Sequence, residues 1–248
     1  MSVTNAQRRY VRELHTRKGR RKYSAFLAEG VVNVGEALGS GAQVREVYAL
    51  PSALVSIGPV DARVAVFEVG PAELARLSTQ RSPHGAVAVV EQPQTPAAAI
   101  AAARRILHLD GVADPGNVGT LIRTAEWFGC GAVTAGEGTA DWYNPKVVAA
   151  ARGSLFRLPH RRLEDAELEG MLATHTLVSA DLGGESSARF AWPEAGILAI
   201  GSESHGPSAA LRRLSPKRVT LPPARSSRAE SLNAAVAGGI LLAAWAGS

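Results

Sequence analysis

The sequence has few cysteine, methionine and aromatic residues, and it contains no apolar run long enough to cross a membrane. Its 248 residues include one cysteine, two methionines and 5% aromatic side chains. The single Cys130 excludes an intrachain disulfide. No charged segment followed by an apolar core and a small-residue cleavage site stands at the N-terminus, so we expect a cytoplasmic protein. The apolar runs at 97–103 and 232–247 are shorter than the roughly 20 residues that span a bilayer, and no membrane segment is predicted.

The chain does contain a dense group of basic residues at its N-terminal end. Residues 1–30 hold eight basic and two acidic side chains, a net charge of +6, whereas the whole chain carries +5. Such a cluster favours a polyanionic partner, because each neutralised phosphate releases counterions. The alternative is a solvated basic tail without function. Tyr10 and Tyr23 interleave with the arginines and are able to stack on bases, although two tyrosines are a weak signal.

The apolar content of 46% is ample for a core, and the pattern of residues changes near position 93. Before it, the spacing predicts a small α/β domain, with helices over 26–38 and 71–77 and strands over 44–50, 62–69 and 86–93. A segment rich in proline and then in alanine follows. We therefore expect an N-terminal domain at 1–92, a linker at 93–104 and a second domain at 105–248.

Beyond the linker, apolar strands alternate with helices. Strands are predicted over 105–111, 132–135, 175–180, 196–203 and 218–222, and helices over 117–128, near 145–151 and at the C-terminal end. This order indicates a parallel sheet covered on both faces, in which ligands bind at the carboxyl ends of the strands. Three polar, glycine-bearing loops stand at those ends: DGVADPGNVG, GSESHG and PPARSSRAESLN.

In the first loop, Asn117 follows a turn and is a candidate cap for the next helix. Arg123 lies away from the predicted buried stripe of that helix and is free to face a substrate. The alternative is an ordinary solvated arginine. The predicted stripe comprises Val118, Leu121, Ile122, Ala125 and Phe128.

The second loop, 201–207, follows a buried strand, and its glycines allow close approach of a ligand to the backbone. It matches neither the dinucleotide-binding fingerprint nor a P-loop, and alone it is equally consistent with a plain turn. His205 has no second histidine at ligand spacing, so we predict no metal site. Ser202 and Ser204 lack the spacing of a hydrolase nucleophile elbow.

The third loop leads into an apolar helix that opens with Ser231 and Asn233. Ser231 is explained as an N-cap, whereas Asn233 weakens a helix interior and needs another reason. The helix has apolar residues on two opposite faces, which indicates two partners: the sheet and a second subunit. The alternative is a helix buried wholly within one subunit.

Taken together, the three loops resemble the SpoU, or TrmH-like, RNA 2'-O-methyltransferases of the SPOUT class. The residues that carry the resemblance occur in the family's order and cover about 105–248: Asn117, Gly119, Arg123 and Ala125, then Gly201, Glu203 and Gly206, then Pro222 followed by Ser231, Leu232 and Asn233. The stretch KGRRKYSAFLAEG is similar to the start of the ribosomal-protein-like RNA-binding domain that many members carry.

The resemblance implies an α/β fold with a SPOUT-type parallel sheet and a C-terminal trefoil knot, preceded by that small RNA-binding domain. It implies a homodimer that binds S-adenosylmethionine (AdoMet) and RNA, with ribosomal RNA favoured over transfer RNA. The implied site residues are Arg123 as the catalytic arginine, supported by Asn117, Glu203, Ser231 and Asn233, and Gly201, Leu221, Leu232 and the flanking Ile200 and Pro222 at the cofactor. We expect RNA contacts from Arg17, Lys18, Arg20, Arg21 and Lys22.

The sequence departs from the family pattern at two places. Pro222 is followed by Pro-Ala-Arg where members usually have Met-x-Gly, and Ser204 and Pro207 replace a glycine and a large apolar residue. These changes lie in the loops expected to bind the cofactor. They motivate an alternative hypothesis, an RNA-binding protein of the same fold that has lost catalysis. A nucleotide-dependent oxidoreductase is disfavoured because no glycine fingerprint with a downstream acidic residue follows any strand.

Overall fold

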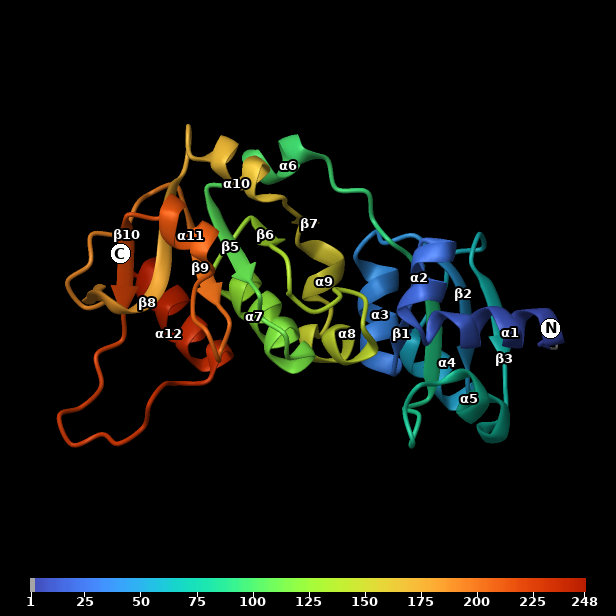
Figure 1. Ribbon diagram of the computed structural model, residues 1–248. Helices are drawn as coiled ribbons and strands as arrows, with labels where there is room; N and C mark the ends of the chain where they lie inside the picture. The colour runs from blue at the N-terminus through green and yellow to red at the C-terminus, as the bar shows by residue number, and fades with distance from the viewer. Residues whose placement is uncertain (1–2) are drawn as a thin grey trace. The chain divides into compact units, whose positions relative to one another are not determined.

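The computed structural model describes residues 3–248 and divides into two compact units (Figure 1). One unit comprises the chain up to Gln94 together with Asp141–Arg157, and the other comprises Thr95–Ala140 and Leu158–Ser248. The segment Asp141–Arg157 carries α8 (Pro145–Ala151) and α9 (Ser154–Arg157), and α8 packs against β1 of the first unit. None of the helices in the described part of the chain is long and apolar enough to span a membrane.

The first unit is built on a four-stranded mixed sheet of order β1-β4-β2-β3. Strand β4 is antiparallel to both β1 and β2, and β3 is parallel to β2. The strands are β1 (Ala25–Glu29), β2 (Val44–Ala49), β3 (Ala65–Glu68) and β4 (Ala86–Glu91). The helices before the insertion are α1 (Asn5–Leu14), α2 (Arg17–Tyr23), α3 (Val31–Gly39), α4 (Pro51–Ile57) and α5 (Pro71–Leu77).

Two parts of this unit differ from the sequence prediction. The predicted helix over 26–38 is wrong in its first part, where β1 runs to Glu29 and Gly30, at φ +89°, turns the chain into α3. A fully buried strand has no polar alternation, so its pattern merges with that of the helix. The basic N-terminal segment, which had no assigned structure, forms α1 and α2, and Thr4 and Thr16 cap these helices.

The second unit confirms the predicted parallel sheet. Its six strands pair in parallel in the order β10-β8-β9-β5-β6-β7. The strands are β5 (Arg105–Asp110), β6 (Ala132–Ala135), β7 (His160–Arg162), β8 (Thr176–Ser186), β9 (Gly196–Gly201) and β10 (Lys217–Thr220). The trefoil knot implied by the family resemblance stays a prediction.

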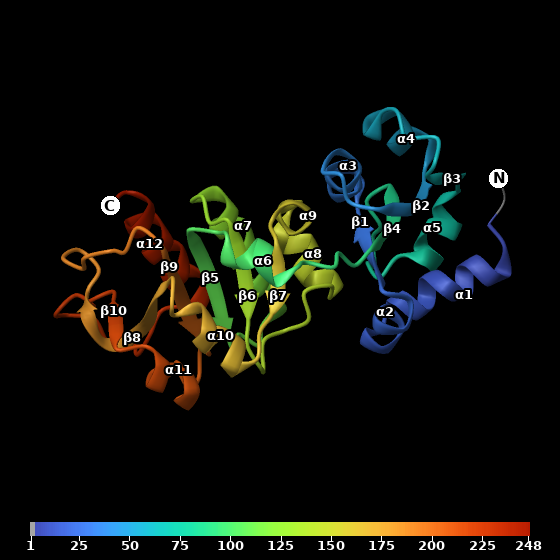
Figure 2. The same cartoon turned by 90° about the horizontal axis from the view of Figure 1, so that it is seen from above.

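Helices cover both faces of this sheet, as Figure 2 shows for α7 and α12 on one side and α10 and α11 on the other. The helices are α6 (Ala97–Ala101), α7 (Pro115–Trp127), α10 (Asp165–Met171), α11 (Ala209–Leu214) and α12 (Ala234–Ala246). Ile100, Leu168 and Leu211 of three helices join one apolar cluster with strand residues. On the opposite face α12 lies against α7, and a Cβ on Gly238 would come within 2.4 Å of Leu121 Cδ2. Glycine therefore permits the close approach of these two helices.

Candidate active site

The first of the three loops ends in a helix cap that differs from the predicted one. Asp114 is the N-cap of α7, and its side chain accepts a hydrogen bond of 2.8 Å from the backbone N–H of Asn117. Pro115 occupies the first helical position, which suits its fixed φ and missing N–H. The prediction that Asn117 caps this helix is therefore wrong, and its side-chain amide is left for other contacts.

Asn117 connects the other two loops through its side chain. Its Nδ2 donates to Glu203 Oε1 at 2.6 Å, and its Oδ1 accepts from Asn233 Nδ2 at 3.0 Å. Glu203 lies 86 positions and Asn233 116 positions from Asn117 along the chain. Three of the five predicted catalytic residues therefore form one continuous chain of hydrogen bonds at the carboxyl edge of the sheet.

Asn233 has a second contact that accounts for its place before an apolar helix. It is the N-cap of α12, and its Oδ1 accepts from the backbone N–H groups of Ala235 at 3.0 Å and Val236 at 3.2 Å. The interpretation of Ser231 as the N-cap is therefore wrong. Ser231 lies two residues before the cap, is exposed, and makes no hydrogen bond with Asn117 or Glu203. Leu232, between Ser231 and Asn233, has no side-chain oxygen. The helix therefore begins after Asn233, whose side-chain oxygen accepts from the free amides of the first turn.

The loop that carries Glu203 is closed on itself. Ser202 and Gly206 exchange two backbone hydrogen bonds of 3.1 and 2.8 Å, and Gly206 has φ +66°. A Cβ on Gly201 would lie 2.5 Å from the backbone of Gly206 and Pro207. Gly201 is therefore required by the fold of this loop, in which the returning chain passes directly over the end of β9.

Asp110 is a residue of this site that sequence reasoning missed. It ends β5, is 8% exposed, and its Oδ2 accepts a hydrogen bond of 2.6 Å from the backbone N–H of Ser208. The buried carboxylate thus holds the far end of the Gly201–Pro207 loop to the central strand. A charge-assisted bond to a backbone amide is stronger than a neutral one. The signal in the sequence was an acidic residue at the point where a largely apolar strand enters the first loop.

Arg123 lies apart from this chain of hydrogen bonds. It is exposed on α7, and it makes no hydrogen bond or ion pair with the residues that the structure describes. Six residues separate it from Asn117, which corresponds to about 9 Å along the helix axis and about two-thirds of a turn around it. Its guanidinium is therefore available to a ligand, and the predicted stripe from Val118 to Ala125 is buried beneath it.

The predicted cofactor residues lie at the ends of two strands and before α12. Ile200 and Gly201 end β9 and are buried, Leu221 and Pro222 follow β10, and Leu232 is 49% exposed beside Asn233. Within 221–232, the described backbone makes one hydrogen bond to itself, from Ser227 N to Ala224 O. An apolar side chain next to unpaired backbone donors and acceptors fits AdoMet, which carries an apolar adenine face and polar groups on its edge.

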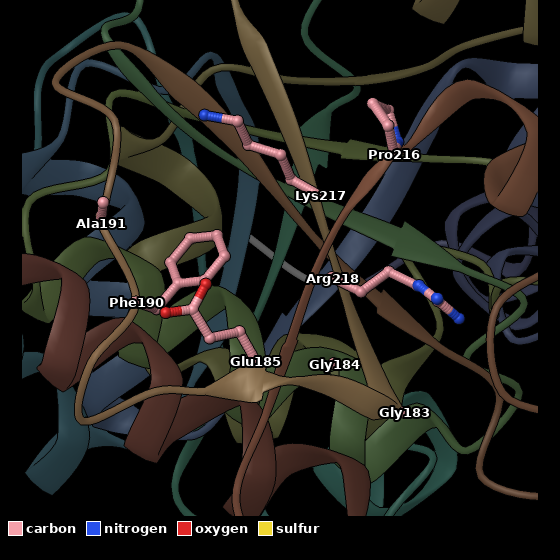
Figure 3. Close-up of a pocket in the computed structure, with 8 residues that line it drawn as sticks. All are labelled: Gly183, Gly184, Glu185, Phe190, Ala191, Pro216, Lys217 and Arg218. Atoms are coloured by element: carbon pink, nitrogen blue, oxygen red, sulfur yellow. The ribbon is translucent and has the colours of Figure 1, made fainter.

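A separate hollow of about 360 Å³ lies between β8 and β10 in the same unit. In Figure 3, Lys217 and Arg218 extend in opposite directions from β10, and the Phe190 ring lies near Glu185. This hollow contains none of the predicted site residues. Its remaining lining residues are Gly183, Gly184, Ala191 and Pro216. Among residues 3–248 no group of three metal-ligating side chains is gathered at this or any other place.

The five residues predicted to contact RNA lie on α2, in the first unit. Arg17, Lys18, Arg21 and Lys22 are exposed. Arg20 is only 4% exposed; its guanidinium donates to Asp141 at 2.7 Å and to the carbonyls of Leu14 and His15 at 3.0 Å. A buried arginine with these bonds fixes the local fold, and the RNA contacts expected of these five residues stay a prediction.

The comparisons with known proteins agree with this geometry. Residues 104–243 match the SpoU rRNA Methylase family, and residues 5–88 match the MRM3-like substrate binding domain. The chain is 32% identical over 247 residues to the 23S rRNA (guanosine(2553)-2'-O)-methyltransferase RlmP of Bacillus subtilis, covering 97% of this chain and 96% of that protein.

Two solved structures share the fold over nearly the full length. A TrmH-family protein of Porphyromonas gingivalis has a TM-score of 0.90 and 34% identity, covering 99% of this chain and 98% of that one. The SpoU methyltransferase AviRb of Streptomyces viridochromogenes, in complex with AdoMet, has a TM-score of 0.84 and 29% identity, covering 98% and 97%. Since the family match spans more than half of the sequence and lies over the three loops joined by Asn117, this chain belongs to the SpoU rRNA methylase family.

Proposed function

We propose that this protein is an AdoMet-dependent RNA 2'-O-ribose methyltransferase that acts as a cytoplasmic homodimer on ribosomal RNA rather than on transfer RNA. The observation that carries the proposal is the chain of hydrogen bonds from Glu203 through Asn117 to Asn233. It gathers the three loops that distinguish the family into one site. The preference for ribosomal RNA is supported by the 23S rRNA specificity named for the relative from Bacillus subtilis and by the matching substrate-binding domain.

The cofactor would be held by the backbone of residues 200–201 and 221–222 and by the side chain of Leu232. When bound, AdoMet would supply an electrophilic methyl group: the ribose 2'-oxygen would bond to the methyl carbon as the carbon–sulfur bond breaks and the neutral thioether leaves. The chain's own contribution is to align the accepting hydroxyl and to exclude other geometries, because a displacement requires the oxygen, methyl and sulfur in line. Asn117 and Asn233 hold the loops in register, and Asp110 anchors the loop that carries Glu203.

Arg123 would position the accepting ribose. A guanidinium, with a pKa above about 12, is a poor base but a good donor to phosphate and to a developing alkoxide. Its exposure on α7 leaves its N–H groups free for an RNA phosphate and the adjacent 2'-hydroxyl. Arg123 thus lowers the barrier by stabilising negative charge on the attacking oxygen.

The homodimer is supported by an uncovered apolar strip beside Arg123. Val236 and Ile240 of α12 are 51% and 46% exposed, and Trp127 of the neighbouring α7 is 83% exposed. The opposite face of α12 is buried against the sheet through Leu241, Leu242 and Trp245. Three large apolar side chains on adjacent helices form a surface suited to a second copy. A dimer formed there would bring Arg123 to the interface.

The experiment is methyl transfer from labelled AdoMet to ribosomal RNA, followed by digestion to nucleosides. The proposal predicts label on one ribose, which disappears when that nucleotide is replaced by its deoxyribose form. Label that survives the replacement would assign the accepting atom to the base and would overturn the proposal. No binding of AdoMet at millimolar concentration would favour the RNA-binding protein without catalysis.

A further inference from the structure

A hollow of about 430 Å³ lies between α1 and α2 in the first unit. It is lined on one wall by two tyrosines, Tyr10 and Tyr23, and on its rim by side chains of both charges. Of its lining residues, Lys22 was predicted from sequence to contact RNA, and the sequence also indicated, weakly, that Tyr10 and Tyr23 stack on bases. The lining is completed by Asn5, Ala6, Arg9 and Glu13.

The two tyrosine rings are fixed in place within the free protein. They meet edge to face, with ring centroids 4.8 Å apart at an interplanar angle of 81°. The hydroxyl of Tyr10 accepts a hydrogen bond of 3.1 Å from Arg45 Nη1, and the hydroxyl of Tyr23 donates to Glu13 Oε2 at 2.8 Å. A ligand that contacts these rings therefore loses little affinity to side-chain ordering.

Glu13 holds the cations of the rim around the rings. It accepts hydrogen bonds from Lys22 Nζ at 2.8 Å and Arg9 Nε at 3.2 Å. The bonds from Lys22 and Tyr23 lower the pKa of Glu13 to about 2, so the carboxylate stays ionised at neutral pH. Lys22 Nζ also lies 4.5 Å from the centroid of the Tyr23 ring. Two cations and one carboxylate leave the rim with a net positive charge.

The surroundings of the hollow are also cationic. Arg12 on α1 and Arg17, Lys18 and Arg21 on α2 are exposed and form no ion pair with any residue in the described part of the chain. These unpaired charges flank the hollow on the two helices that form it. They provide contacts for successive phosphates of a strand that enters it.

We propose that this hollow binds one unstacked nucleotide of a single-stranded segment of the RNA substrate, with its base against Tyr10 and Tyr23 and its phosphate between Arg9 and Lys22. The inference rests on the proposed function and adds the place and manner of substrate contact. Aromatic contact with a base is tolerant of sequence, because every base has a π face. The hollow therefore contributes affinity and strand placement without selecting the base.

The test uses the full-length protein and a ribosomal RNA fragment that the wild type methylates. The variant Tyr10→Leu with Tyr23→Leu should raise the RNA dissociation constant roughly 5- to 100-fold, the range for loss of one base–aromatic contact. The dependence of affinity on salt should not change, because no phosphate contact is removed. Arg9→Ala should instead reduce the salt slope by about 1. The matched control is Arg63→Ala, an 89% exposed arginine of the same unit, which should leave both quantities unchanged.

Cross-linking keeps the test valid if the double variant folds poorly, since both rings also pack on the core of the unit. RNA containing 5-iodouridine should cross-link to Tyr10 or Tyr23 of the wild type, as mapped by mass spectrometry. Tyr23→Phe, which keeps the ring but loses the hydroxyl bond to Glu13, should weaken RNA binding less than the double variant does. Cross-links confined to other residues, or unchanged affinity in a folded double variant, would overturn the proposal while methyl transfer persists. A wild type that methylates no ribosomal RNA would overturn the proposed function instead.

Discussion

The side-chain amide of Asn233 donates a hydrogen bond of 3.0 Å to the side-chain oxygen of Asn117, across 116 positions of sequence. The oxygen of the same Asn233 side chain caps α12 by accepting from two backbone amides. One residue thus begins the last helix and joins it to the start of α7. Aspartate would serve as a cap alone, and serine has one short hydroxyl, whereas an amide side chain supplies an accepting oxygen and donating N–H groups on two separate atoms.

Substitution of Asn233 separates the two contacts. Asn233→Ser keeps an oxygen for the cap and loses the longer amide N–H group that reaches Asn117, whereas Asn233→Ala loses both contacts. We expect Asn233→Ala to lower the free energy of unfolding by about 1 kcal/mol, and Asn233→Ser to change it by less than about half of that. Both variants should weaken AdoMet binding. Urea unfolding and calorimetry measure the two effects. Normal AdoMet affinity in both variants would limit Asn233 to helix capping.

Arg123→Ala tests the role of the exposed guanidinium. We expect turnover at saturating RNA to fall at least about 100-fold, the scale for removal of one donor to a developing oxyanion. AdoMet affinity should stay near that of the wild type, because Arg123 lies outside the loops that would hold the cofactor. Arg189→Ala, which removes another exposed arginine of the same unit, is the control and should retain activity. Methyl transfer by Arg123→Ala at the wild-type rate would exclude Arg123 from the mechanism.

The apolar strip on α12 is tested by introducing charge. Val236→Glu with Ile240→Glu should convert a dimer into monomers in sedimentation equilibrium, because carboxylates cannot be buried unpaired at an interface. Methyl transfer should be lost with the dimer. The control is Leu182→Glu, which adds a charge at an apolar residue that is 74% exposed away from this strip. A double variant that stays dimeric would show that the interface lies elsewhere. A wild type that sediments as a monomer would show that the protein does not form the proposed dimer.

Part of the second unit was predictable from sequence, because β6 and β9 are short apolar strands and α7 and α12 have clear helical patterns, whereas the polar strand β7 was not predicted. The predicted strand over 132–135 matches β6 of this unit, and the helix predicted near 145–151 matches α8, which belongs to the first unit. The first unit was harder, since buried β1 runs into α3 with one glycine between them. The capping pair of Thr4 and Gln7 is the sequence signal for the start of α1.

The site was predictable as a set of loops but not as a network of contacts. Family motifs placed Asn117, Glu203 and Asn233 together, and the chain of hydrogen bonds between them follows from no local pattern. Arg20 and its basic neighbours are indistinguishable in sequence, yet Arg20 is buried beside Asp141, which lies 121 positions away. Asp110 was missed for the same reason, because its partner is a backbone amide 98 positions away. Long-range partners of polar groups are set by the tertiary fold.

Stability should fall in mild acid because of a buried histidine. Burial of His108 in β5 lowers its pKa to about 4, from an ordinary value of 6.5, since desolvation disfavours the imidazolium. The unfolded chain therefore takes up a proton at a higher pH than the folded one. The contribution of neutral His108 to the free energy of unfolding is fully present above pH 6.5. It is lost as the pH falls from 6.5 toward 4, in total about 3 kcal/mol.

The measurement for His108 is urea unfolding between pH 7.5 and 4.5, in the wild type and in His108→Gln. The variant should be less stable at pH 7.5 and should show a flatter decline with falling pH. Buried His160, whose pKa is also lowered by desolvation, is present in both proteins and leaves a common residual slope. An equal decline in the two proteins would show that the pKa of His108 does not differ between the folded and unfolded states.

Titration calorimetry of the full chain with AdoMet tests whether the three loops joined by Asn117 hold the cofactor. We expect saturable binding to the wild type with one molecule per chain, and binding at least about tenfold weaker in Asn117→Ala, in line with the loss of hydrogen bonds to two partners. Thr120→Ala, one turn further along α7, should bind as the wild type does. Absence of binding to the wild type, or equal affinity in Asn117→Ala, would contradict the account.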